Sequence, residues 1–340
     1  MDKFQIMTFD GGGIRGSLVA ALLHRLQDRF PKLLENVDLF AGTSTGSAIA
    51  LSLAYGRSPS DMQTLYSMDN MKFVFGNPRW NFLRPRHSNE CLGKLLQEHF
   101  PDVGDAQKPR KLLLSDLKKK VLVTSFKLDV EHMKSWSPTF FHNYDGDVSW
   151  MEPSSDQPVV DVALRSAAAP TIFPSHQGYI DGGMMANNPS TAAIAVALRH
   201  NPDIDIKKIR VLSFGTGYNP TLIKSGTHNW GVLQWILNPF REPKEPLLTI
   251  LFDGVVEADN YMSREILGED RYCRLNLSLP TQTACDDWRA VPELVKLANS
   301  KTSDKEKNKE IDQIIDSTVE WLENNWFDTP QEVSVAAGMR

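Results

Sequence analysis

The sequence predicts an α/β protein in which helices cover both faces of a mainly parallel central sheet. Two observations predict this fold class. Short apolar runs alternate with helix-like segments along most of the chain, which is typical of parallel sheets. In addition, glycine-rich turns follow the first two apolar runs, at the strand ends where the functional loops of such sheets lie. The expected strands are residues 4–9, 37–42, 120–128, 178–180, 209–214 and 272–279.

A glycine-rich loop at residues 10–16 follows the first expected strand and precedes a helix-like run. Consecutive glycines leave backbone N–H groups uncovered, and the start of a helix adds unpaired donors. Such a loop binds negative oxygen, either that of a phosphate or the oxyanion formed when a serine attacks an ester. We expect Asp10 to cap the loop through backbone hydrogen bonds. Arg15 is expected to orient the loop, pair with a carboxylate, meet a lipid phosphate or form a structural salt bridge.

The phosphate alternative has some support, because Gly11, Gly13 and Gly16 match the spacing of a dinucleotide-binding loop. That fold also needs an acidic residue at the end of the next strand to bind the ribose. Here the next strand ends at Gly42, and Asp38 lies inside it. A Walker-type loop is excluded because no Gly-Lys-Ser/Thr ending follows. The spacing therefore favours the oxyanion over the nucleotide.

The second expected strand leads into Ser44, which lies in a Gly-x-Ser-x-Gly pattern before another helix-like run. This pattern is typical of a sharp strand-to-helix turn that lifts a serine hydroxyl clear of the backbone. Gly42 and Gly46 flank the serine because the turn leaves no room for larger side chains. The pattern makes Ser44 a candidate nucleophile.

A third block, Asp181, Gly182 and Gly183, follows the expected strand at residues 178–180 and a small-residue stretch at residues 166–170. Taken alone, Asp-Gly-Gly is most simply a turn, since aspartate caps local backbone and glycine adopts positive φ. A functional role for this block is suggested only by its occurrence after the glycine loop and the serine turn.

In their order and spacing, these blocks resemble the patatin-like phospholipases over residues 4–217. The resemblance implies a three-layer patatin-like fold, a Ser44 nucleophile and Asp181 as its partner. It also implies an oxyanion hole formed by N–H groups of Gly12 and Gly13, with Gly11 or Thr45. The residues that support these motifs are Asp10, Arg15, Gly16, Gly42, Gly46, Gly182 and Gly183.

The same resemblance divides the chain into two parts. Residues 1–217 form the catalytic core that carries all the motifs, and residues 218–340 complete the sheet and add a flanking helical or lid region. A helix with one apolar stripe is expected within residues 301–327, where it packs on the domain or pairs with a second copy.

Serine is a weak nucleophile and needs a base. None of the eight histidines lies in a recognisable motif. An aspartate with its ordinary pKa of about 3.9 is a poor base unless burial raises that pKa or the oxyanion is strongly stabilised. A Ser-His-Asp triad through His200 or His228 is the alternative. Position argues against it, because α/β-hydrolases place several strands before the nucleophile and only one precedes Ser44.

Composition excludes several other classes. A net charge of −5 gives no sign of nucleic-acid binding. The three cysteines, Cys91, Cys273 and Cys285, are widely spaced and indicate a reducing compartment, with no zinc site and no disulfide framework. We expect neither a metal nor a cofactor. No signal peptide and no apolar run of about eighteen residues is present, so we expect a cytoplasmic protein that docks on membranes when active.

Two segments break the α/β pattern. Residues 71–87 mix aromatic and cationic side chains, and residues 230–252 are rich in tryptophan, leucine and isoleucine. Each is expected to be either a lid or membrane-contact surface, or buried packing between the core and its flanking region.

The sequence thus predicts a lipid acyl hydrolase of phospholipase A or lysophospholipase type that acts through an acyl-enzyme. One alternative is the same enzyme held inactive until a cyclic nucleotide binds, as the resemblance to bacterial antiphage effectors implies. Another is a lipid-binding module without catalysis. Membrane phospholipid is the expected partner, with a cyclic nucleotide and a second copy of the chain as further candidates.

Overall fold

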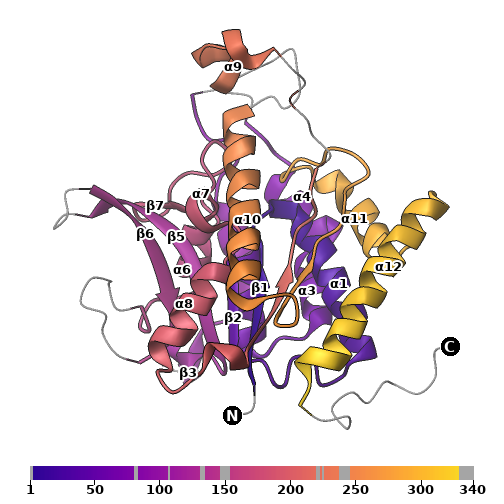
Figure 1. Cartoon of the computed structure of the whole chain (residues 1–340). Helices are drawn as coiled ribbons and strands as arrows, with labels where there is room; N and C mark the ends of the chain where they lie inside the picture. The colour runs from indigo at the N-terminus through magenta and orange to yellow at the C-terminus, as the bar shows by residue number, and fades with distance from the viewer. Residues whose placement is uncertain are drawn as a thin grey trace.

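The computed structural model describes residues 3–79, 83–105, 108–130, 135–145, 154–219, 223, 226–236 and 246–328. It is an α/β structure with a central sheet between two helical layers (Figure 1), which confirms the predicted fold class. The strand order is β6-β5-β2-β1-β8-β9, with β7 also paired to β5. The strands of this sheet are β1 (Phe4–Phe9), β2 (Leu39–Thr43), β5 (Lys120–Val130), β6 (Ser135–His142), β7 (Tyr179–Asp181), β8 (Ile209–Phe214) and β9 (Tyr272–Leu275).

The strands at the middle of the sheet are parallel, whereas β6 and β7 run antiparallel to β5. Each of the six expected strands is present. The prediction missed β6, which contains Pro138 and is half exposed. An edge strand tolerates a proline because one side of it needs no ladder hydrogen bonds, so its sequence lacks the apolar alternation of a core strand. The prediction also missed the short hairpin of β3 (Val103–Asp105) and β4 (Lys108–Arg110).

Side chains of the central strands alternate between two cores. Met7 and Phe9 of β1 enter one core, and Phe4 and Ile6 enter the other. The helices are α1 (Gly16–Arg29), α2 (Thr45–Tyr55), α3 (Pro59–Leu65), α4 (Met68–Phe75), α5 (Glu90–His99), α6 (Val159–Ser166), α7 (Gly183–Ala186), α8 (Ser190–His200), α9 (Val232–Ile236), α10 (Pro246–Leu267), α11 (Val291–Ala298) and α12 (Lys305–Trp321). Helices α1, α2, α11 and α12 belong to the first core, while α8 and the end of α10 pack on the second. Figure 1 shows α8 and α10 in front of the sheet.

The C-terminal helix α12 packs on the domain through Ile311, Ile315 and Val319, as one of the two alternatives predicted. Just beyond it, Trp326 is fully buried, and its carbonyl accepts a hydrogen bond from the Gln5 side chain at 2.7 Å. β9 lies in the same sheet as β8. The division of the chain at residue 217 stays a prediction.

The two unusual segments differ from each other. In residues 71–87, Phe75 and His87 are buried with their rings 5.2 Å apart, whereas Phe73 and Leu83 are exposed, so the described part of this segment is packed only in part. In residues 230–252, α9 and the start of α10 leave large apolar side chains exposed. Residues 80–82 and 237–245 lie outside the described residues. No described helix has the length and apolarity needed to cross a bilayer.

Candidate active site

The serine elbow lies where the parallel strands β1 and β2 end side by side. Ser44 has φ 54° and ψ −121°, a strained conformation for a residue with a side chain. A Cβ at Gly46 would lie 2.2 Å from the Phe9 carbonyl oxygen, and one at Gly42 would lie 2.1 Å from the Gly46 carbonyl oxygen. Only glycine fits at these two positions, so the turn is as sharp as the pattern indicates. The Ser44 side chain stays partly exposed.

The elbow is held by Ser166, which sequence analysis noted only as part of a small-residue stretch. The Ser44 N–H donates to Ser166 Oγ at 2.8 Å, and that hydroxyl donates to the Thr124 carbonyl at 2.7 Å. This chain of hydrogen bonds ties the strained residue to β5. A serine is small enough for the close packing and supplies both a donor and an acceptor.

Asp181 lies at the end of β7, paired with Ser125 of β5, and is buried. Its carboxylate accepts a hydrogen bond from the Gly183 N–H at 2.7 Å. Burial raises the pKa of Asp181 to about 6, although the nearby Ser44 hydroxyl and the Gly183 N–H oppose this rise. The structure therefore brings Ser44 and Asp181 together and gives the carboxyl group a pKa suited to a base near neutral pH.

The glycine loop presents two N–H groups that have no hydrogen-bond acceptor among the described residues, those of Gly12 and Gly13. The N–H of Gly11 donates to the Asn187 carbonyl at 3.1 Å, and that of Ile14 donates to the Cys285 carbonyl at 2.8 Å. The Gly11 N–H is thus engaged, which argues against its predicted role as an oxyanion donor. Gly12 and Gly13 remain candidates, as does Thr45 at the first turn of α2.

The loop is also braced from the C-terminal part of the chain. The Asp10 carboxylate accepts hydrogen bonds from both terminal nitrogens of the Arg274 guanidinium, that from Nη1 at 2.7 Å, and both side chains are buried. Arg274 also donates to Ser213 Oγ at 2.8 Å. The predicted cap was therefore wrong, because the Asp10 carboxylate pairs with a cation rather than with loop N–H groups. Of the four roles expected for Arg15, its contacts fit the first, orientation of the glycine loop, because its side chain donates to the Gly217 carbonyl at 3.0 Å.

Gly12→Ala is expected to lower kcat by about 10²- to 10³-fold. A Cβ at Gly12 would lie 2.4 Å from Thr216 Oγ1, which itself donates to the Gly11 carbonyl at 2.8 Å. The new methyl group would displace the loop and misplace an oxyanion donor. The matched control is Gly93→Ala, whose Cβ would make only an ordinary contact at 3.7 Å. Equal rates for the two variants in steady-state kinetics would contradict the role of this loop.

Histidine is not brought to Ser44 among the described contacts. His200 stacks on Tyr144 with ring centroids 4.9 Å apart, and Lys120 lies 5.1 Å above the same tyrosine. Lys120 begins β5, opposite the first residue of β2, whereas Ser44 follows the end of β2. His200 is therefore at the wrong end of the sheet for a triad. His228 has no described contact with Ser44 or Asp181.

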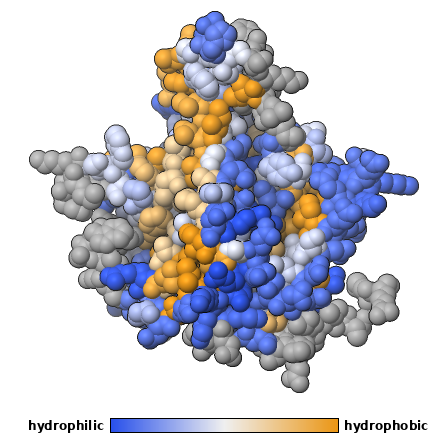
Figure 2. Space-filling view, in the orientation of Figure 1, coloured by the Kyte–Doolittle hydropathy of each residue, from blue (hydrophilic) through white to orange (hydrophobic). Residues whose placement is uncertain are grey.

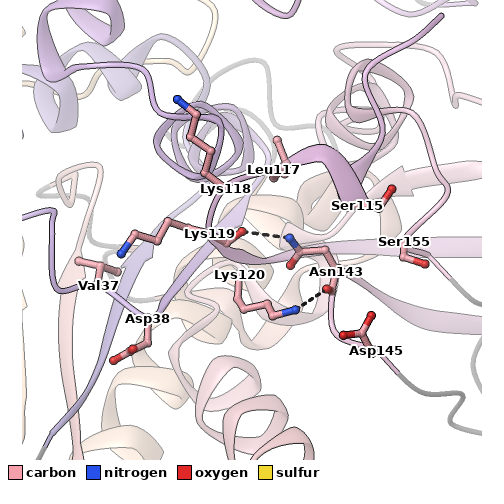
Figure 3. Close-up of a pocket in the computed structure, with 10 residues that line it drawn as sticks. All are labelled: Val37, Asp38, Ser115, Leu117, Lys118, Lys119, Lys120, Asn143, Asp145 and Ser155. Carbon is pink, nitrogen blue, oxygen red and sulfur yellow. Dashed lines mark hydrogen bonds between the residues drawn. The ribbon is translucent and has the colours of Figure 1, made fainter. Parts of the chain in front are cut away.

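A cavity of about 470 Å³ lies at the same amino-terminal end of β2 and β5. Its ten lining residues include Lys118, Lys119 and Lys120, whose side chains point in different directions (Figure 3). Lys119 donates to the Glu35 carbonyl at 2.7 Å and Lys120 to the Asn143 carbonyl at 2.9 Å. The ammonium groups do not converge as a phosphate site requires, and the cavity is separate from Ser44. The described side chains contain no cluster of three or more metal-ligating groups.

A family model described as "Patatin-like phospholipase" matches residues 7–194, which include the glycine loop, Ser44 and Asp181. The chain belongs to the patatin-like phospholipase family. This confirms the resemblance found from the motifs and makes the protein a phospholipase-type ester hydrolase.

Relatives of this patatin-like phospholipase align over different shares of its length. CotR of Bacillus subtilis is 34% identical over 96% of this chain and 99% of its own. Protein teg of Priestia megaterium is 35% identical over 88% of this chain and 95% of its own. The 85/88 kDa calcium-independent phospholipase A2 of Rattus norvegicus is 29% identical over 63% of this chain and 27% of its own.

Four residues that support the site were not predicted as such: Ser166, Asn187, Arg274 and Cys285. Ser166 lies in a block that was noted for its small residues, so that block carried a signal. Arg274 and Cys285 lie far from every motif in the sequence, and no local pattern marks them.

Proposed function

We propose that the protein hydrolyses acyl esters of membrane phospholipids through a Ser44–Asp181 dyad. The observation that supports this most directly is that the partly exposed Ser44 lies beside the buried carboxyl group of Asp181, whose pKa is raised to about 6. The N–H groups of Gly12 and Gly13, which have no acceptor in the described part of the chain, add a place for the oxyanion. A relative named as a calcium-independent phospholipase A2 supports phospholipid as the substrate class.

In the proposed reaction, Asp181 accepts the proton of Ser44 as the Ser44 oxygen attacks the ester carbonyl carbon. The carbonyl oxygen becomes an oxyanion held by the N–H groups of Gly12 and Gly13. When the ester C–O bond breaks, Asp181 gives its proton to the departing alcohol, a lysolipid or glycerol derivative, and an acyl-enzyme remains. Water then attacks the acyl group, gives a proton to Asp181, and releases the fatty acid as that proton returns to Ser44.

The pH dependence follows from the same carboxyl group. Below its pKa of about 6, Asp181 is protonated and unable to accept the Ser44 proton. We expect kcat/KM to rise about tenfold per pH unit below that value and to level off above it. The measurement is a pH profile on a soluble ester, in buffers of constant ionic strength. A plateau that extends down to pH about 4.5 would contradict an Asp181 base of this pKa.

The function is tested by incubating the purified protein with mixed phospholipid vesicles and identifying the released products by mass spectrometry. Labelling with a fluorophosphonate, followed by peptide mapping, identifies the reactive serine. We expect fatty acid and lysolipid as products and the label on Ser44. A label on another residue, or no label and no product, would overturn the proposal and favour a lipid-binding module.

A separate hypothesis is that the same hydrolase is inactive until a cyclic nucleotide binds to it. The vesicle assay tests it by adding a panel of cyclic nucleotides and cyclic dinucleotides. An activated enzyme would release fatty acid only with one member of the panel. A high rate that is indifferent to the panel would contradict this regulation and leave the hydrolase unchanged.

A further inference from the structure

One end of the molecule carries an exposed apolar surface, which we call the apolar tip. Its side chains come from α9 and from the first turns of α10. Val232, Leu233 and Ile236 are 72%, 76% and 57% exposed, and three α10 residues are each 43% exposed. The six side chains of the tip are Val232, Leu233, Ile236, Leu247, Ile250 and Leu251. Contiguous exposed apolar surface of this kind marks an interaction site in a water-exposed protein.

The described residues of α9, of the loop before it and of the first turns of α10 carry no charged side chain. Residues 226–236 and 246–252 contain no Asp, Glu, Lys or Arg, in a chain where these make up 23% of the residues. Next to the exposed side chains, Trp230 and Trp235 pack edge to face with ring centroids 5.1 Å apart. Indole rings favour the boundary between lipid headgroups and acyl chains. For the described residues this composition suits contact with a headgroup layer. Residues 237–245, which join α9 to α10 and include Arg241, Glu242, Lys244 and Glu245, lie outside the described residues.

The apolar tip leads directly to the proposed active site. Phe252 follows Leu251 on α10, and its Cε1 atom lies 2.5 Å from the position a Cβ at Gly183 would take. The Gly183 N–H in turn binds Asp181. Figure 1 shows α9 standing clear of the rest of the fold beyond the N-terminal end of α10, and Figure 2 shows apolar surface on it that continues along α10. A bilayer that touched the tip would therefore lie near Phe252, which packs beside the Gly183 that binds Asp181.

We infer that the apolar tip is the surface by which the protein docks on a phospholipid bilayer. This inference rests on the proposed function, since the hydrolysis of membrane lipids is the reason for choosing a bilayer over another apolar partner. The uncharged side chains of α9 enter the boundary between headgroups and acyl chains. The exposed first turns of α10 then form the apolar path along which an acyl chain reaches Phe252 and Ser44.

The test uses variants in a Ser44→Ala background, so that binding is measured without hydrolysis. Vesicles are prepared from phosphatidylcholine alone and with added phosphatidylglycerol, and bound protein is measured by flotation. Leu233→Asp with Ile236→Asp is expected to weaken vesicle binding by at least about tenfold, because two inserted side chains become charged. The matched control is Ile266→Asp at the other end of α10, where the side chain is 41% exposed. We expect the control to bind vesicles as its parent does.

Thermal unfolding of each variant shows whether the fold is retained. Unchanged binding by the folded tip variant, or equal loss in the control, would overturn the inference. So would a tip variant that binds vesicles normally but no longer self-associates in size-exclusion chromatography, since the tip would then bind a second copy. The proposed function fails separately: tip-dependent binding by a protein that releases no fatty acid from the same vesicles would leave the docking surface and remove the hydrolase.

Discussion

Ser44→Ala is expected to lower the release of fatty acid from phospholipid vesicles by about 10⁴-fold or more. The hydroxyl of Ser44 is the group that forms the acyl-enzyme in the proposed reaction, and its neighbour Asp181 is the proposed base. Removing one atom leaves no nucleophile in the site. Single-turnover and steady-state rates on a labelled phospholipid measure the loss.

Two further variants make this result specific. Ser52→Ala removes a hydroxyl from α2, the helix that follows Ser44. That hydroxyl donates to the Ala48 carbonyl at 2.5 Å and lies 2.8 Å from His99 Nε2, and we expect a rate within about threefold of the parent. Ser44→Gly should be as inactive as Ser44→Ala yet more stable by about 0.5–1 kcal/mol, because φ 54° is easy for glycine and strained for alanine. Residual hydrolysis of more than a tenth in either Ser44 variant would end the dyad proposal.

Arg274→Met is expected to lower the free energy of unfolding by about 3–5 kcal/mol. The Arg274 guanidinium and the Asp10 carboxylate are both buried, and the substitution leaves the carboxylate without its cation. Because Asp10 begins the glycine loop, activity should fall as well. Chemical denaturation followed by tryptophan fluorescence measures the change in stability.

The comparison variant is Arg264→Met, which removes an exposed ion pair with Glu269 at 3.5 Å. We expect it to change the free energy of unfolding by less than about 1 kcal/mol. The double variant Asp10→Asn with Arg274→Met should recover part of the lost stability, since no buried charge is left unpaired. A cost for Arg274→Met no larger than that of Arg264→Met would show that the buried pair contributes little.

The parts of the fold and site that were predictable are those that a short stretch of sequence specifies. The turn at Ser44 has steric needs that its two flanking glycines meet, so the pattern alone indicates it. The central strands are apolar because both faces of the sheet are covered. In contrast, β6 is an edge strand with Pro138, and nothing in its local pattern separates it from a loop.

Contacts between residues far apart in the sequence were the least predictable part of the site. Asp181 was paired with Ser44 only through the resemblance to the patatin-like phospholipases, because an Asp-Gly-Gly turn has a simpler local explanation. Burial of Asp181, which raises its pKa, depends on packing that no spacing reveals. Asp10 was expected to cap the loop but pairs with Arg274. This too depends on packing, since the two residues meet only when β9 joins the sheet.

The bracing of the glycine loop from Arg274 and Cys285 has a consequence for how the protein is made. A nascent chain emerges from the ribosome amino end first, so the loop, Ser44 and Asp181 leave the exit tunnel well before either brace does. Until then, Asp10 lacks its cation and the Ile14 N–H lacks its carbonyl acceptor. The translating polypeptide therefore carries all its signature motifs while its catalytic machinery is still unassembled, and we expect hydrolysis to begin only after Arg274 and Cys285 have left the exit tunnel.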